Sequence, residues 1–254
     1  MNKNIISQIN HIVKERPKVC IILGSGLNSF INLIENKRIL SYKNIKGFLQ
    51  TTVSGHKGEF IYGNINKTPI LCANGRYHYY EGYSFKEVGI LIEIFKHYNP
   101  RQYIITNSSG CLRLDWDLGT FMLVDKFIDF SFIDSNQIIK YELNNISIPN
   151  LNIYRGTYVY TIGPTYETRA EIKEIINING DVVGMSTFPE YIMCKELNIN
   201  PIIISCLTNY GAGLQKKEIN HKDVLLNANK VKYKFSKLII KIIEDIELQK
   251  KQKK

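Results

Sequence analysis

The sequence has no apolar run long enough to cross a membrane. No stretch of its 254 residues approaches the roughly 18 to 20 consecutive apolar residues that a spanning helix needs. The polar first residues, MNKNIISQIN, also lack the apolar segment of a secretory signal. We therefore expect a cytoplasmic protein without a membrane partner.

Closely spaced cysteines are missing too. The five cysteines are odd in number and scattered, with no C-x-x-C pair: Cys20, Cys72, Cys111, Cys194 and Cys206. This pattern argues against a disulfide framework and against a zinc site. We expect reduced thiols that behave as small buried hydrophobic side chains, and no bound metal.

No repeat and no low-complexity linker divides the chain. With 44% hydrophobic residues, a chain of this length can bury roughly 70–75% of its unfolded surface. We therefore expect one domain over residues 1–254, with 250–254 as a disordered basic tail.

A shaped basic surface is not evident either, although Lys and Arg exceed Asp and Glu by 33 to 23. Four of these cations lie in the final KKQKK, and the other lysines accompany abundant Asn and Ile along the whole chain. A solvated surface explains this balance better than a nucleic-acid partner does. A nucleic-acid-binding module remains the alternative, and it would show a salt-sensitive gel shift.

What is present is an alternation of β-branched apolar runs with helical patterns, which is typical of an α/β fold. Strands are expected in 18–26, in two parts of 58–75, and in 102–110, 120–128, 157–164, 181–185 and 201–209. Helices are expected in 85–98, 168–180 and 188–197, and from about His221.

Two helix starts carry the pattern of a capping box, in which a threonine and a glutamate three residues later satisfy free N–H groups. The pairs are Thr168 with Glu171 and Thr187 with Glu190. Residues just before these helices lie at strand carboxyl ends, where α/β sheets usually bind ligands.

A glycine turn follows the first strand in LGSGLNS, residues 23–29. A dinucleotide fingerprint would need a third glycine at position 29, where Ser29 stands, and an acidic residue after the next strand. The turn can present N–H groups and the Ser25 hydroxyl to a phosphate, or it can be a tight connection only. The motif alone favours neither.

The segment NGRYHYYEGYS places Arg76, His78 and Tyr80 on one face if the chain is extended. A guanidinium, an imidazole and a phenol in a row suit an anion that has a hydroxylated group beside it. A nucleic-acid surface would show more cations here, whereas Glu81 follows directly. A small pocket is therefore favoured.

Other polar residues also occupy loops and strand ends. They are His56 between glycines, Asn107, Ser108 and Ser109 after a strand, and Glu167 and Ser186 before helices. Each one alone is explained by ordinary loop or capping chemistry. Their joint pattern carries more weight.

Eight motifs in order, ILGSGL, GHKG, GRYHYYEGY, TNSSG, GPTYET, VGMSTFPE, SCLTN and INHKDVL, resemble those of the trimeric purine nucleoside phosphorylases from about residue 18 to 230. The resemblance implies a nucleoside phosphorylase-like α/β fold, with a central mixed, twisted sheet that forms a partial barrel flanked by helices. It also implies a homotrimeric pentosyltransferase of purine salvage. Such an enzyme cleaves a purine nucleoside with phosphate, giving the free base and ribose 1-phosphate, and uses no cofactor besides phosphate as co-substrate.

The same resemblance implies roles for particular residues. Phosphate would contact Ser25, His56, Arg76, His78, Ser108 and Ser186, with Ser108 acting mainly through its N–H. The ribose would contact Tyr80, Met185 and His221, and the base would contact Tyr166, Glu167 and Asn209. The catalytic set would be Asn209, Glu167 and His78.

Substrate preference is expected to follow from Glu167, because a 6-oxopurine presents an N1–H donor to this carboxylate whereas adenine presents a bare acceptor. Losing such a bond costs about 1.5–3 kcal/mol, or roughly ten- to hundredfold. Inosine and guanosine are the expected substrates. The alternatives are a methylthioadenosine phosphorylase-like activity and a nucleoside- or phosphate-binding protein without catalysis.

The chain departs from this family between 127 and 155, where a few dozen residues are missing. That segment of the family includes an aromatic residue lent to the neighbouring subunit's ribose site. Phe130 and Phe132 are the candidates for a replacement.

Overall fold

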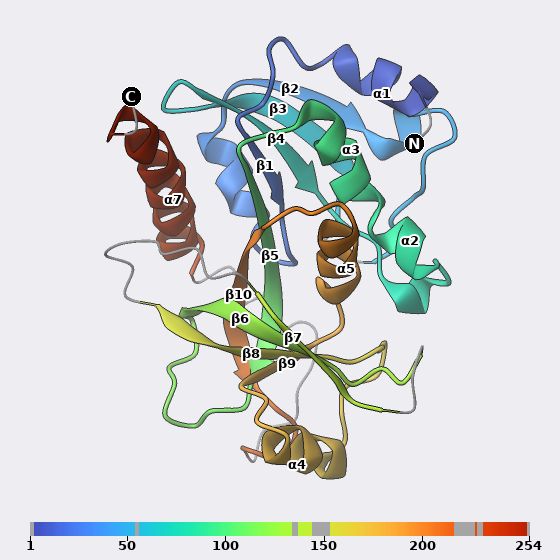
Figure 1. Cartoon of the computed structure of the whole chain (residues 1–254), viewed down its shortest axis with the longest axis vertical. Helices are drawn as coiled ribbons and strands as arrows, with labels where there is room; N and C mark the ends of the chain where they lie inside the picture. Colours follow the sequence, from blue (N-terminus) through green and yellow to red (C-terminus); the bar gives the residue numbers. More distant parts are fainter. Residues whose placement is uncertain are drawn as a thin grey trace.

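The computed structural model describes residues 3–53, 56–133, 137–143, 153–215, 227 and 231–252 (Figure 1). Its strands form one mixed sheet in the order β10-β6-β8-β9-β5-β1-β4-β3-β2, with β7 paired to β6. The strands are β1 (Val19–Ile22), β2 (Glu35–Ser41), β3 (Glu59–Ile65), β4 (Thr68–Asn74), β5 (Gln102–Cys111), β6 (Phe121–Asp129), β7 (Ile139–Glu142), β8 (Tyr154–Tyr160), β9 (Val182–Gly184) and β10 (Ile202–Tyr210). The α-helices are α1 (Lys3–Asn10), α2 (Phe85–Val88), α3 (Ile90–Tyr98), α4 (Arg169–Asn177), α5 (Phe188–Glu196) and α7 (Lys232–Gln252).

One end of this sheet closes into a small barrel. Strand β5 pairs with β10 on one side and with β9 on the other, and the path β10-β6-β8-β9 completes the ring. The first half of β5 also pairs with β1, which leads into the open part of the sheet. The expected mixed sheet with a partial barrel is therefore confirmed, and β5 belongs to both parts.

Helices cover both faces of the sheet. In β1, Cys20 and Ile22 pack into a core shared with α1, α3 and α5, whereas Val19 and Ile21 pack into a second core shared with α7. A third, smaller core lies between the barrel and α4, at the bottom of Figure 1. Because successive side chains of a strand point to opposite faces, the continuous apolar run of β1 serves two cores at once.

The predicted helix over 85–98 is two helices. Helix α2 ends at Val88, and α3 begins at Ile90. At Gly89 an added Cβ would lie 2.9 Å from Cβ of Met193 in α5, so only a glycine allows this close packing. Helix α3 then ends at Asn99, whose left-handed backbone caps it immediately before Pro100.

Other differences from the expected elements lie at the ends and edges of the chain. The elements α1, β2 and β7 were not expected from the sequence. Helix α7 runs from Lys232 to Gln252, so the first three residues of the expected tail are helical, whereas most of 221–230 lies outside the described residues.

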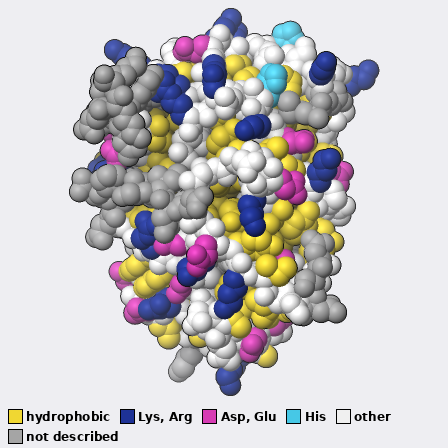
Figure 2. Space-filling model, viewed as in Figure 1, with side chains coloured by type: hydrophobic (Ala, Val, Ile, Leu, Met, Phe, Trp, Pro, Cys, Tyr) yellow, Lys and Arg dark blue, Asp and Glu magenta, His cyan; other side chains and the backbone are white. Residues whose placement is uncertain are grey.

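The five cysteines are all free and buried, as expected from their spacing. No helix in the described part of the chain is long and apolar enough to cross a membrane. On the face shown in Figure 2, Lys and Arg side chains occur in separate positions from top to bottom, with Asp and Glu among them.

Candidate active site

A pocket of about 730 Å³, including its open mouth, lies where the carboxyl ends of several strands meet. It is built from the loops after β1, β4, β8 and β9 and from the second half of β5 and the end of β10. The predicted residues in its lining are Ser25, His56, Arg76, His78, Tyr80, Ser108, Tyr166, Glu167, Met185, Ser186 and Asn209. Every predicted site residue within the described part of the chain is thus in one pocket; His221 lies outside the described residues.

Close packing of the β1 loop against β5 brings Ser25 into this pocket. At Gly24 an added Cβ would lie 2.6 Å from Cα of Asn107, which explains the glycine in LGSGL. Ser108 Oγ donates to the Ser25 carbonyl oxygen at 2.8 Å, and Ser25 Oγ lies 3.1 Å from His56 Nε2. The loops that carry Ser25 and His56 are therefore joined by side chains at one wall of the pocket.

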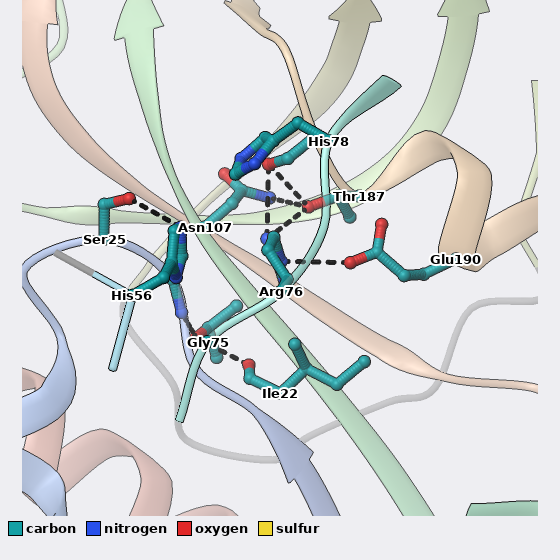
Figure 3. Close-up of polar contacts among 12 residues, drawn as sticks. Ile22, Ser25, His56, Gly75, Arg76, His78, Asn107, Thr187 and Glu190 are labelled. Carbon is teal, nitrogen blue, oxygen red and sulfur yellow. Dashed lines mark hydrogen bonds and ion pairs between the residues drawn. The ribbon is translucent and has the colours of Figure 1, made fainter. Parts of the chain in front are cut away.

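Arg76 is the best-held cation of this pocket, with only 1% of its surface exposed. Its Nη1 donates to Ser186 Oγ at 3.2 Å and to Thr187 Oγ1 at 3.1 Å. Its Nε lies 3.0 Å from Oε1 of Glu190, which is fully buried (Figure 3). Among the described residues Nη2 and Nε have no hydrogen-bond partner, and only Nε has the ion pair with Glu190, so the hydrogens of Nη2 are unsatisfied.

This ion pair overturns one expectation from the sequence. The predicted capping box is present for Thr168 and Glu171, but Thr187 and Glu190 do not form one. Glu190 turns inward to Arg76 instead, because a buried guanidinium needs a counter-charge. Thr187 Oγ1 accepts from Arg76 and, at 3.0 Å, from Asn107 Nδ2.

The segment after β4 is extended only up to His78, because Tyr79–Glu81 form a 3-10 helix. The expected extended run is therefore corrected, although the three predicted side chains still share the pocket. Arg76, His78 and Tyr80 line the pocket, whereas Tyr77 is buried among aromatic rings. The His78 and Tyr80 rings stack with centroids 4.8 Å apart. The three residues therefore form a continuous wall.

Glu81 holds the His78 side chain in place. Its Oε1 accepts from the backbone N–H of His78 at 2.8 Å and lies 3.0 Å from His78 Nδ1, while its Oε2 accepts from Thr52. Burial alone would raise the pKa of Glu81, but the bonds from His78 and Thr52 outweigh burial and lower it to about 2. The carboxylate stays ionised and orients the imidazole.

Tyr80 and Met185, both in the pocket lining, meet at Gly163. An added Cβ on Gly163 would lie 2.5 Å from Met185 Sδ and 2.9 Å from Tyr80 Cδ1. Burial raises the pKa of the Tyr80 phenol to about 12, so the phenol keeps its proton at neutral pH.

Glu167 and Asn209 also line the pocket, and each is held by a polar neighbour. Thr161 Oγ1 donates to Glu167 Oε1 at 2.8 Å. Burial raises the pKa of Glu167, and the bond from Thr161 partly offsets this. Asn209 Oδ1 accepts from Thr208 Oγ1 at 2.9 Å, and Asn209 Nδ2 donates to the Tyr210 carbonyl oxygen, which leaves its second hydrogen available.

Comparison with known proteins adds an independent observation. A family model described as the phosphorylase superfamily matches residues 18–244. Purine nucleoside phosphorylase 1 of Geobacillus stearothermophilus is 31% identical over 271 aligned residues, which cover 97% of this chain and 99% of that protein. The chain belongs to the purine nucleoside phosphorylase family.

More distant members of the purine nucleoside phosphorylase family match as well. The Bos taurus enzyme is 28% identical, with 84% of this chain and 83% of that protein covered. Among solved structures, the Schistosoma mansoni purine nucleoside phosphorylase in complex with inosine superposes with a TM-score of 0.81 at 27% identity, with 95% of each chain covered. The structure of that enzyme in complex with adenosine gives 0.82, also at 27% identity.

Several residues that support this phosphorylase pocket could not be assigned from the motifs. Glu190 and Thr187 were assigned to a helix cap, and Asn107 was treated as one polar residue at a strand end. Thr161, six residues before Glu167, had no motif of its own. Glu81 is the exception: it follows His78 by three residues, a spacing that allows a side-chain contact.

The shortened segment of this family member lies beside the part of the pocket that Tyr166 and Glu167 line. Phe130 and Phe132 are in contact, with ring centroids 5.0 Å apart, and they line a second hollow together with Tyr166 and Glu167. Phe132 is 48% exposed. Whether either ring replaces the aromatic residue of a neighbouring subunit stays a prediction.

Proposed function

We propose that this chain is a purine nucleoside phosphorylase that transfers the ribosyl group of inosine or guanosine to inorganic phosphate. The observation that carries this proposal is that one pocket gathers groups suited to all three parts of the reaction. Arg76, which contacts Ser186, would form the phosphate end with His78, and Tyr80, stacked on His78, would form the middle with Met185. Glu167 and Asn209 would form the far end, where the base binds.

The Arg76 end suits a phosphate. The free Nη2 donor is buried, and a charge-assisted bond to a phosphate oxygen would satisfy it. The hydroxyls of Ser25 and Ser186 and the rings of His56 and His78 surround the same space. Since the Arg76 charge is balanced by Glu190, the site is not an open cationic patch, and the directed donors provide the selectivity.

The middle of the pocket suits the reacting sugar. The glycosidic bond breaks through a state in which the ribose is cationic, so a phosphate held below C1′ is both nucleophile and counter-charge. Tyr80, with its phenol protonated, and Met185 would hold the ribose above this phosphate. No covalent intermediate with the enzyme is needed.

The far end suits a 6-oxopurine. Asn209 would donate its remaining amide hydrogen to N7 and stabilise the negative charge that develops on the base. Glu167, with Oε1 occupied by Thr161, would accept N1–H through Oε2. Adenine offers an acceptor at N1 and would face this carboxylate without a bond.

Three further features are part of the proposal: a homotrimer, a cytoplasmic location, and phosphate as the only co-substrate with no other cofactor. Light scattering after size-exclusion chromatography tests the trimer, and activity after dialysis against a chelator tests the cofactor requirement. The domain organisation, one domain over 1–254, stays a prediction.

The deciding experiment measures base release from inosine, guanosine, adenosine and methylthioadenosine, with and without phosphate. We expect phosphate-dependent release of hypoxanthine and formation of ribose 1-phosphate. Faster cleavage of adenosine or methylthioadenosine than of inosine would contradict the substrate assignment. Binding of inosine without any cleavage would instead indicate a binding protein.

Two variants test the proposed phosphate end and the proposed ribose contacts of the pocket. Arg76→Ala should chiefly raise KM for phosphate, and Tyr80→Phe should chiefly raise KM for the nucleoside. Lys57→Ala is the matched control, because Lys57 is an exposed cation beside His56 that does not line the pocket. A gel shift that is salt-sensitive, survives Arg76→Ala and weakens on deletion of 250–254 would favour the nucleic-acid alternative.

A further inference from the structure

Thr187 has a backbone conformation that is rare for its residue type. Its φ is 74° and its ψ is −36°, and the Phe188 N–H donates to the Ser186 carbonyl oxygen at 2.8 Å. This three-residue turn with positive φ is a strained γ-turn. For a β-branched residue such a backbone is a true outlier, and outliers of this kind gather at functional sites.

The start of helix α5 does not explain why a threonine occupies this position. The Thr187 side chain makes no capping bond to α5. A glycine would adopt the same φ without strain. The threonine hydroxyl must therefore have another use.

The hydroxyl is fully buried and joins three separate segments of the chain. It accepts from Arg76 Nη1 at 3.1 Å, in the segment after β4, and from Asn107 Nδ2 at 3.0 Å, in β5. Figure 3 shows the contacts from Arg76 and Asn107 meeting at the Thr187 hydroxyl, while Glu190 contacts the Arg76 guanidinium at another nitrogen. Both lone pairs of the hydroxyl oxygen are used by these two donors.

These contacts determine which edge of the guanidinium meets a ligand. Ser186 and Thr187 share Nη1, and Glu190 lies within ion-pair distance of Nε without a hydrogen bond to it. Among the described residues, Nη2 is therefore the guanidinium nitrogen with neither a hydrogen bond nor an ion pair. Ser186 itself lies on the pocket wall, 3.4 Å from the Thr187 hydroxyl. Rotation of Arg76 about its long axis would break these contacts together.

We propose that Thr187 is a positioning residue for the phosphate site: its hydroxyl, held in place by the γ-turn, orients Arg76 and Asn107 so that Arg76 Nη2 faces the bound phosphate. This role rests on the function proposed above and adds to it a residue that does not itself bind the substrate. The strain of the turn is the cost of placing a hydroxyl, rather than a glycine, between the two donors.

The test compares three substitutions of Thr187. Thr187→Val keeps the branched shape but removes the hydroxyl, Thr187→Ser keeps the hydroxyl, and Thr187→Gly removes both the hydroxyl and the strain. We expect Val and Gly to raise KM for phosphate roughly tenfold or more, with KM for inosine changed less than about threefold. Thr187→Ser should restore most of the phosphate affinity.

The matched control is Thr68→Val, which replaces another buried threonine far from the pocket lining and should change neither KM. Unchanged phosphate KM in Thr187→Val, or an equal rise in both KM values with no rescue by Thr187→Ser, would overturn the role. If Thr187→Val does not fold, Thr187→Gly gives the decision, since glycine fits the backbone of the turn.

Calorimetric titration with inorganic phosphate separates this inference from the proposed function. The same order of affinities, Thr and Ser above Val and Gly, is expected whether or not the protein turns over a nucleoside. A wild-type protein that binds phosphate but cleaves no purine nucleoside would refute the proposed function, and the titration series would still decide the role of Thr187.

Discussion

Thr161 Oγ1 donates a hydrogen bond of 2.8 Å to Oε1 of Glu167, a residue of the pocket lining, and this bond leaves Oε2 for the proposed contact with the base. Burial raises the pKa of Glu167, whereas the bond from Thr161 favours its ionised form. Thr161 thus both orients the proposed base-recognising carboxylate and keeps it charged.

Thr161→Val should therefore shift the pH dependence of inosine cleavage. Without the bond the pKa of Glu167 rises further, so the fall in kcat/KM on acidification should begin at a higher pH than in the wild type. At neutral pH we expect kcat/KM for inosine to be roughly tenfold lower. Thr161→Ser should behave like the wild type. Superimposable profiles for Val and wild type from about pH 5 to 8 would show that Thr161 has no such effect.

Glu190→Gln should destabilise the protein strongly, because it leaves the Arg76 guanidinium buried without its counter-charge. Breaking one side of a buried ion pair typically costs about 3–5 kcal/mol of the free energy of unfolding. Phosphate should recover part of this loss, since it supplies a negative charge to the same guanidinium. Denaturant unfolding with and without phosphate measures both effects.

The control for this substitution is Glu196→Gln, in the same helix but exposed. It should change the free energy of unfolding by less than about 0.5 kcal/mol. If Glu190→Gln were equally mild, the ion pair would not hold Arg76 in place.

Gly163→Ala should impair nucleoside binding selectively. The new Cβ would press on Met185 Sδ and Tyr80 Cδ1, at a residue whose φ is +73°. We expect KM for inosine to rise about tenfold or more, with a smaller effect on KM for phosphate. Gly47→Ala is a close control, because Gly47 has a φ of +79° but nothing within 4 Å of an added Cβ. If both variants raised KM for inosine equally, backbone strain rather than contact with Met185 and Tyr80 would explain the increase.

Glu81→Gln should lower the free energy of unfolding by an amount that depends on pH. The folded-state pKa of Glu81 is about 2, below its ordinary value of 4.5, so its carboxylate stabilises the folded state fully above about pH 4.5. This contribution is lost as the pH falls toward 2. The difference in unfolding free energy between wild type and Glu81→Gln should therefore shrink over this range. A difference that is constant with pH would show that the charge of Glu81 is not what holds His78.

Much of the architecture could be predicted from the sequence because it depends on local patterns. The β-branched runs of β1, β5 and β10 and the capping box of Thr168 carry their signals within a few residues. The break between α2 and α3 could not be predicted, because Gly89 is required by Met193, a hundred residues later. The closure of the barrel depends likewise on the pairing of β5 with β10.

The predicted site shows the same division. Ser25, Arg76, Tyr80, Glu167 and Asn209 were assigned from the resemblance of their motifs to the phosphorylase family, and all of them lie in one pocket. The motifs did not indicate which residues contact and orient these side chains. The spacing of Thr187 and Glu190 matches a capping box in the sequence, but the two residues do not form one in the structure.

The sequence alone therefore determined most strands and helices and one helix cap. These features depend on β-branching and capping spacings, which act over one or two turns of backbone. The tertiary structure alone decided which carboxylate neutralises Arg76 and how its guanidinium is oriented. Burial of Arg76 makes an unpaired guanidinium far more costly than an uncapped helix, and it brings Glu190, 114 positions away, to its Nε. That competition between a local and a distant interaction is decided by desolvation, which has no local signature in the sequence.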